Sequence, residues 1–198
     1  MSYPTRFQLL FIALILAASF SDVSGQARGV NAERARAIER AEMDRLLMLA
    51  VPTDKESEAM RLSRAKKIKD DFRDLQSLNN KMMADAWLQE ALDYSAIADM
   101  VSKIRGKAND LKGSLVLPKS EDAQTASRPP EVSTGRQFRE KLLQLDKTIM
   151  SFVNNPIFQA ANTVDIHLAK KASTDLEQVI SLTVHLKQTA QKLRKSGQ

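Results

Sequence analysis

One stretch of the chain, residues 62–115, decides the fold that the sequence predicts. It reads LSRAKKIKDDFRDLQSLNNKMMADAWLQEALDYSAIADMVSKIRGKANDLKGSL. Apolar residues recur along it at intervals that are mostly three and four residues, a spacing typical of apolar seams on long helices packed side by side. The stretch therefore predicts two helices that each bury one seam. The first seam holds Leu62, Ala65, Ile68, Phe72, Leu75, Asn79, Met82 and Ala86, and the second holds Tyr94, Ile97, Val101, Ile104, Ala108, Leu111 and Leu115.

The apolar spacing fails between the two seams, where polar residues occupy positions that a continuous seam needs. We interpret the gap as a turn that closes an antiparallel hairpin over residues 54–113, with Trp87, Leu88 and Leu92 covering the end of the hairpin. One long helix with a stutter is the alternative, because neither Gly nor Pro occurs between residues 53 and 105.

Capping boxes mark the predicted starts of three helices. In a capping box, a Ser or Thr hydroxyl and a Glu or Gln side chain three residues later satisfy each other's free backbone N–H groups. The last box would start the final helix, after a short helix or turn at residues 162–171. The three boxes are Thr53 with Glu56, Thr134 with Gln137, and Thr174 with Glu177.

The predicted fold is all-α. We expect a bundle of about four long helices, made of the hairpin and of helices over residues 135–153 and 174–195, with an accessory N-terminal helix near residues 31–50. Residues 114–133 are rich in Pro, Ser, Thr and acidic residues, and they cannot bury enough apolar surface to order themselves. They predict a mobile surface linker within a single helical domain over residues 26–198.

Residues 1–25 have the pattern of a cleaved signal peptide. Arg6 precedes an apolar run from Leu9 to Phe20, which is shorter than the roughly 20 residues that span a membrane. Small residues follow, and cleavage after Gly25 would leave no transmembrane segment. An uncleaved N-terminal anchor is the alternative. We therefore expect an exported protein, either periplasmic or extracellular.

The composition of the chain indicates where the protein is located and which classes of partner it binds. The chain has no cysteine, so an exported domain of this size relies on packing, which favours a bacterial envelope over a eukaryotic secretory product. Its formal net charge is +6, which suits anionic envelope components such as phospholipid head groups or lipopolysaccharide phosphates. Lys and Arg are also good helix formers that cover solvated faces. Nucleic acid is not expected, because the few aromatic residues do not alternate with basic ones.

Metal and haem sites of helical bundles need residue patterns that this sequence lacks. A ferritin-like di-metal centre needs Glu-x-x-His and covalent haem needs Cys-x-x-Cys-His, and neither pattern occurs. Haem held by His and Met, in bundles that resemble periplasmic cytochrome b562, needs an inward histidine on the last helix. His185 instead falls between the inward Thr183 and Leu186. The scattered methionines fit core filling better than copper binding, so we expect no cofactor.

Asn79 is the polar residue of the first seam. A polar side chain at a seam position fixes the register or the partner of a helix at some cost in stability. A contact to a ligand is the alternative, and Asn80 beside it offers an exposed hydrogen-bonding group.

The sequence predicts a protein that is not an enzyme. It contains no Gly-framed serine, no histidine placed near a nucleophile and an orienting carboxylate, and no Gly-rich phosphate loop. We expect it to act by protein–protein contact or by binding an envelope component. A peripheral binder of anionic membranes or lipopolysaccharide is the alternative, and a haem- or metal-binding bundle is a further one. The candidate interaction surface comprises Arg61, Arg64, Lys66, Lys67, Lys69, Arg73, Asn79 and Asn80.

Overall fold

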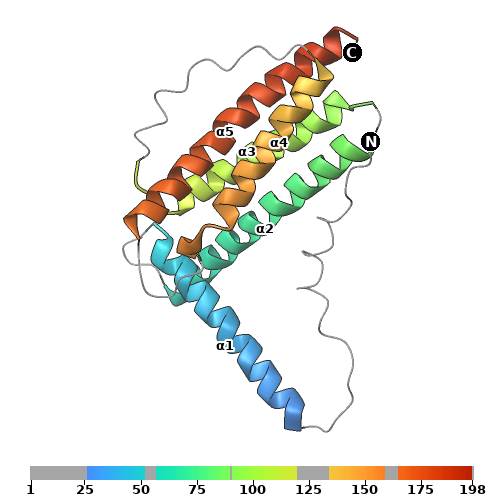
Figure 1. Cartoon of the computed structure of the whole chain (residues 1–198). Helices are drawn as coiled ribbons and strands as arrows, with labels where there is room; N and C mark the ends of the chain where they lie inside the picture. Colours follow the sequence, from blue (N-terminus) through green and yellow to red (C-terminus); the bar gives the residue numbers. More distant parts are fainter. Residues whose placement is uncertain (1–25, 52–56, 90, 120–133, 159–164, 198) are drawn as a thin grey trace. The chain divides into compact units, whose positions relative to one another are not determined.

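The computed structural model describes residues 26–51, 57–89, 91–119, 134–158 and 165–197, with side chains from residue 37 onward. The described residues are helical apart from short turns and connections, and they contain no β-strand, which confirms the all-α prediction (Figure 1). The long helices are α1 (Gln26–Leu49), α2 (Glu58–Leu88), α3 (Tyr94–Ser114), α4 (Gly135–Val153) and α5 (Ile166–Lys195), and a short 3-10 helix, η2 (Pro156–Phe158), follows α4.

The chain divides into two units, residues 1–39 and 40–198, and the boundary lies within α1. In the first unit the structure describes a helical backbone over residues 26–39. The second unit contains the end of α1 and all the other helices. The bundle and the candidate site both belong to this second unit. The predicted signal peptide, residues 1–25, lies outside the described residues and stays a prediction.

Helices α2 to α5 form a four-helix bundle in which each helix packs against two antiparallel neighbours (Figure 1). Helix α3 packs against α2 and α5, and α4 packs against the same two helices. Helices α3 and α4 are therefore diagonal and run in the same direction. Helix α2 ends at Leu88 and α3 begins at Tyr94, and the two helices pack side by side, which confirms the hairpin and excludes one long helix. The chain between α3 and α4 connects opposite ends of the bundle, as in bundles with one long crossover.

Of the two predicted capping boxes that lie in described residues, one agrees with the observed helix start. The Thr134 hydroxyl accepts a hydrogen bond from the Gln137 backbone N–H, as expected. The predicted box at Thr53 and Glu56 lies outside the described residues, and α2 begins at Glu58 after the N-cap Ser57.

The predicted start of the last helix at Thr174 is wrong. Helix α5 begins at Ile166, and Asp165 caps it by accepting hydrogen bonds from the backbone N–H groups of His167 and Leu168. Ala169 and Ala172 are buried and continue the apolar seam one turn before Leu176. The helix therefore continues without a break through Thr174, because packing of the buried Ala169 and Ala172 against the bundle stabilises the earlier turns.

Both predicted seams face the core, with one departure. All seven members of the second seam are buried. Six of the eight members on α2 are buried and Phe72 is half-buried, whereas Leu62 is 46% exposed. Two successive intervals of three residues separate Leu62 from Ile68, and they rotate the side chain by roughly 120° around the helix. Leu62 therefore lies away from the face that Ile68 buries.

Aromatic rings close the corner between α2 and the end of α4. The Phe72 and Phe152 rings are stacked with centroids 5.3 Å apart, and Phe158 packs edge-on against both. Ile157 beside it is buried. The residues after Pro156 thus pack against the bundle.

Trp87 and Leu88 do not cover the end of the hairpin as predicted. They are 50% and 85% exposed, whereas Leu92 packs against the core. Ala86 is fully buried at the end of α2. Each further residue turns by about 100° around the helix, so the next two side chains point away from the core that Ala86 contacts.

The predicted linker at residues 114–133 begins later than expected. Ser114 ends α3, and Leu115 is buried and forms an isolated antiparallel bridge with Ala50. The Val51 N–H donates to the Ser114 carbonyl at 3.0 Å, and the Val116 N–H donates to the Leu49 carbonyl at 2.7 Å. Backbone pairing with the end of α1 therefore orders this part. Residues 120–133 lie outside the described residues, and their mobility stays a prediction.

Two positions on α3 test the packing of the second seam. Ile104→Ala should lower the free energy of unfolding by about 2–5 kcal/mol, because Ile104 is fully buried and truncation leaves a cavity. Gly106→Ala should instead raise it by about 0.5–1 kcal/mol, because a Cβ there meets no atom within 4 Å. Denaturant titration of both variants measures the two effects. A destabilisation of similar size in both would contradict the assigned faces of α3.

Candidate interaction surface

Asn79 connects two helices inside the bundle. Its side chain is fully buried, and Nδ2 donates a hydrogen bond to Oδ1 of Asp146 on α4 at 2.6 Å. No described group donates to its Oδ1. This geometry favours the role in helix pairing over contact with a ligand from outside. Asn80 points the other way and is exposed.

Most of the predicted basic cluster is engaged within the bundle. Lys67 lies 2.6 Å from Asp71 and 3.3 Å from Asp110. The Arg64 guanidinium donates to the Val51 carbonyl. Two further ion pairs join Lys69 to Glu42 at 2.7 Å and Arg73 to Asp70 at 2.9 Å.

Arg61 and Lys66 are the other two cations of the predicted surface. Both are exposed on α2, and neither side chain makes an ion pair or hydrogen bond with the described part of the chain. The structure therefore separates the predicted cluster into engaged cations and two that face solvent. The positive charge that remains for an anionic partner is smaller than the composition indicates.

Asp71 accounts for the position of Lys67 and also engages Lys107 on α3. Its side chain is buried between α2 and α3, where an unpaired carboxylate would be strongly destabilising. Lys107 approaches Asp71 at 2.9 Å and Asp74 at 2.8 Å. Hydrogen bonds to these carboxylates raise the pKa of Lys107. The hydrogen bond from Lys107 in turn lowers the pKa of Asp74 below its ordinary value of 3.8.

A Ser–Lys–Asp cluster joins α4 to α5. The Ser151 hydroxyl donates to Asp175 at 2.7 Å, and the Lys171 ammonium contacts both residues. A nucleophilic serine needs a neighbouring base that accepts its proton. The Lys171 Nζ donates to both Ser151 and Asp175, so it is placed here as a hydrogen-bond donor. The cluster therefore fits the role of tying two helices together.

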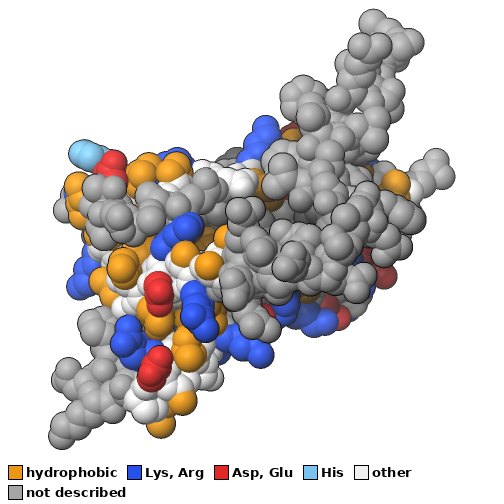
Figure 2. All heavy atoms as spheres, turned by 90° about the horizontal axis from the view of Figure 1, so that it is seen from below, with side chains coloured by type: hydrophobic (Ala, Val, Ile, Leu, Met, Phe, Trp, Pro, Cys, Tyr) orange, Lys and Arg blue, Asp and Glu red, His pale blue; other side chains and the backbone are white. Residues whose placement is uncertain are grey.

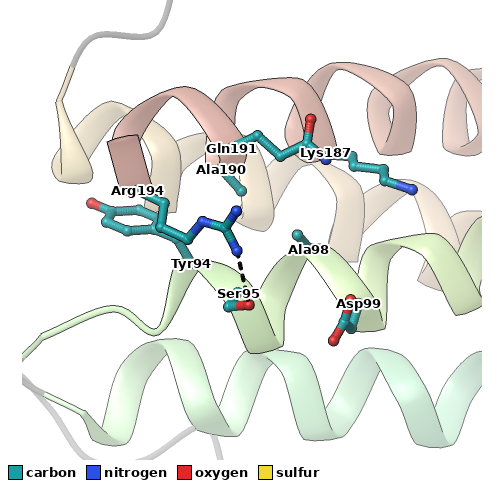
Figure 3. Close-up of a pocket in the computed structure, with 8 residues that line it drawn as sticks. All are labelled: Tyr94, Ser95, Ala98, Asp99, Lys187, Ala190, Gln191 and Arg194. Carbon is teal, nitrogen blue, oxygen red and sulfur yellow. Dashed lines mark hydrogen bonds between the residues drawn. The ribbon is translucent and has the colours of Figure 1, made fainter. Parts of the chain in front are cut away.

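A shallow hollow lies between the start of α3 and the end of α5 (Figure 3). Arg194 reaches across it from α5, and its guanidinium lies 3.4 Å from the Ser95 hydroxyl. Asp99 and Lys187 bring opposite charges to its rim. The hollow holds no group placed as a nucleophile with a base. It is lined by Tyr94, Ser95, Ala98, Asp99, Lys187, Ala190, Gln191 and Arg194.

Metal ligands are not gathered in the part of the chain that the structure describes. The described residues contain no group of three or more His, Cys, Asp or Glu side chains that could hold a metal ion. His167 is exposed near the start of α5, and His185 is half-buried further along the same helix. The same part of the chain contains no helix that is long and apolar enough to cross a membrane.

Large apolar side chains are exposed at the end of the bundle where α2 and α5 begin. Sequence reasoning missed this feature, because Met60 lies outside both seams and Val116 lies in the predicted linker. Figure 2 views the protein from below relative to Figure 1 and shows hydrophobic side chains exposed among charged ones, with part of this face grey. We define the apolar end as Met48 (69% exposed), Val51 (39%), Met60 (63%), Leu62 (46%), Val116 (53%) and Ile166 (53%).

Backbone contacts bring several of these residues together. Hydrogen bonds between residues 49–51 and 114–116 place Val51 and Val116 on neighbouring segments. The Arg64 side chain joins Val51 to the first turns of α2, and Met60 lies one turn before Arg64. The exposed apolar residues of α1, α2 and the end of α3 therefore share one end of the bundle.

Comparison with known proteins gives no family: no protein-family model, no curated protein and no solved structure matches the chain.

The ion pair between Lys107 and Asp74 predicts a pH-dependent stability. Because the folded-state pKa of Asp74 is lowered from 3.8, its contribution is present above that value and is lost as the pH falls through the folded pKa. Asp74→Asn should therefore destabilise the protein at neutral pH, and the difference from the unsubstituted protein should vanish in acid. Thermal unfolding at a series of pH values measures this.

Asp99→Asn is the matched control for this experiment. Asp99 is an exposed carboxylate on the neighbouring helix α3, and it makes no ion pair with a described residue. Its substitution should leave the stability close to that of the unsubstituted protein throughout. An Asp74→Asn effect that persists unchanged below about pH 2 would contradict the assignment to this carboxylate.

Proposed function

We propose that this protein is a non-enzymatic, exported helical protein that acts by binding another protein of the cell envelope through its apolar end. The observation that carries the proposal is the collection of exposed Met, Leu, Val and Ile side chains at one end of the bundle. Contiguous exposed apolar surface on soluble proteins is typical of interaction sites.

The chemistry of the apolar end suits a protein partner. Burying a side chain such as Met60 or Met48 in a complex would contribute about 1–2 kcal/mol each, given their present exposure. Methionine is flexible and polarisable, so it adapts to the shape of an opposing surface. The neighbouring Arg61 adds a charged group at the rim, where polar residues give orientation more than affinity.

The long sides of the bundle are less suited to this role. The exposed positions of α2 include Lys66, Arg73, Ser77 and Asn80, and those of α5 include Gln178. Such residues are well solvated and cost free energy to bury. The Asp71 and Ser151 clusters inside the bundle connect neighbouring helices.

Binding of an anionic membrane or of lipopolysaccharide is the second candidate for this end. Arg61 lies between the exposed Met60 and Leu62, and Lys66 follows one turn later. Basic residues beside exposed apolar ones are typical of interfacial binding. The engagement of Lys67, Lys69 and other cations with carboxylates weakens this candidate relative to a protein partner.

Site-specific photo-cross-linking in the cells that produce the protein tests the first candidate. A photoreactive residue at Val116 should give one discrete protein adduct, and the same probe at Gln178 on the side of α5 should give none. Adding Met60→Ser should weaken the Val116 adduct roughly tenfold, because the loss of about 1.4 kcal/mol of binding free energy changes affinity by that factor.

The comparison between the probes at Val116 and Gln178 tests whether the partner docks at the apolar end. Equal adducts at Val116 and Gln178, or an adduct at Val116 that Met60→Ser leaves unchanged, would contradict docking at the apolar end. Binding to anionic vesicles that Arg61→Gln with Lys66→Gln abolishes would favour the second candidate instead.

The predicted cleavage of residues 1–25 during export can be tested separately. If residues 1–25 are a signal peptide, protein purified from the producing cells should begin at Gln26. The intact mass of the purified protein measures this directly. A mass that includes residues 1–25 would instead favour the N-terminal anchor.

A further inference from the structure

The opposite end of the bundle carries a small apolar tip of a different kind. Trp87 and Leu88, the last two residues of α2, are 50% and 85% exposed. Trp87 is the only tryptophan of the chain. Ala86 before them is fully buried, so the exposed tip directly follows the last core residue of α2.

The end of α2 that carries the tip is hydrogen-bonded to the neighbouring helix α4. Arg139 on α4 donates hydrogen bonds to the Ala86 carbonyl at 3.1 Å and to the Gln89 carbonyl at 3.0 Å. These bonds satisfy carbonyl groups that a helix end leaves without intrahelical partners. The exposure of Trp87 and Leu88 is therefore a property of a fixed helix end.

Cations outnumber carboxylates at this end among the described residues. Asp93 is used as the N-cap of α3, where its carboxylate accepts two backbone N–H groups. Glu140 lies 3.5 Å from Arg136. Lys81 and Asp85 precede the tip on α2, and their formal charges sum to zero. The cations at the ends of α4 and α5 here are Arg136, Arg139, Lys192, Arg194 and Lys195.

From this arrangement we propose that the Trp87–Leu88 tip docks on an anionic phospholipid bilayer. A tryptophan ring is apolar with one polar N–H, which suits the boundary between head groups and acyl chains. Leu88 would enter the acyl region beside it, and the surrounding cations would lie at the level of the head-group phosphates.

The size of the tip favours a bilayer over a protein partner. A stable protein–protein interface buries about 800 Å² on each side, and two partly exposed side chains cannot supply that apolar area. A bilayer needs only a shallow wedge together with electrostatic attraction. This inference is independent of the proposed docking at the apolar end, because the two surfaces lie at opposite ends of the bundle.

The fluorescence of Trp87 tests the inference directly. Protein purified after export is mixed with vesicles of equimolar phosphatidylcholine and phosphatidylglycerol, and with vesicles of phosphatidylcholine alone. The emission should shift to shorter wavelength with the anionic vesicles and stay unchanged with the neutral ones. High salt should reduce the shift, because it screens the attraction of the cations. Since Trp87 is the only emitter of its kind, binding through another part of the chain would leave its emission unchanged.

Matched variants at the two ends locate the contact. Leu88→Ser should lower partitioning into anionic vesicles about tenfold or more, because it removes the side chain placed deepest in the bilayer. Met60→Ser, an exposed substitution at the apolar end, should leave partitioning unchanged. Arg136→Gln with Lys195→Gln should remove the preference for anionic over neutral vesicles. All four substituted positions are exposed, and circular dichroism checks that each of the three variants folds.

Three results would overturn the inference. One is an emission spectrum that anionic vesicles do not change. Another is a Leu88→Ser variant that partitions as well as the unsubstituted protein. The third is a loss of partitioning in Met60→Ser but not in Leu88→Ser, which would assign the membrane to the apolar end. Loss of the cross-linked adduct at Val116, by contrast, bears on the proposed protein partner alone.

Discussion

The burial of α3 against α2 and α5 is the interaction on which the rest of the structure depends. Its seam is apolar without exception, and Ile104, Ala108 and Leu111 are completely removed from solvent. Because both neighbours run antiparallel to it, α4 can complete the bundle only at the diagonal position. The chain after α3 must then return to the opposite end of the bundle before α4 begins, and this requirement accounts for the long connection between two parallel helices.

Charge is used mainly to hold the helices together. The buried Asp71 needs cations from two helices, and Lys67 and Lys107 provide them. On the other side of the bundle, Lys171 contacts Asp175 and Ser151 in the same way. A net charge of +6 therefore does not translate into one basic face. Within the predicted cluster, the two cations whose side chains have no such partner in the described chain, Arg61 and Lys66, lie towards the start of α2.

The two ends of the bundle differ from its sides for a simple physical reason. Along the sides, each helix turns its apolar seam inward and its polar residues outward. At an end, neighbouring helices stop at different levels, so the last apolar residues are left partly uncovered. Here one end exposes mostly aliphatic side chains and methionines, and the other exposes a single Trp–Leu pair. Both proposed contacts therefore use side chains that the bundle itself cannot bury.

The sequence alone determined the all-α class and the helix over residues 135–153, because apolar periodicity and the Thr134 cap act over a few neighbouring residues. It also favoured the α2–α3 hairpin, which the structure confirmed over one long helix. It also marked Asn79 as a pairing position. Only the tertiary structure decided that Asp71 is buried, that most of the predicted basic cluster pairs with carboxylates, and that α5 continues through Thr174. It likewise decided the exposure of Met60, Trp87 and Leu88. These features depend on which helix lies opposite a given side chain and where it stops, and local spacing carries no information about either.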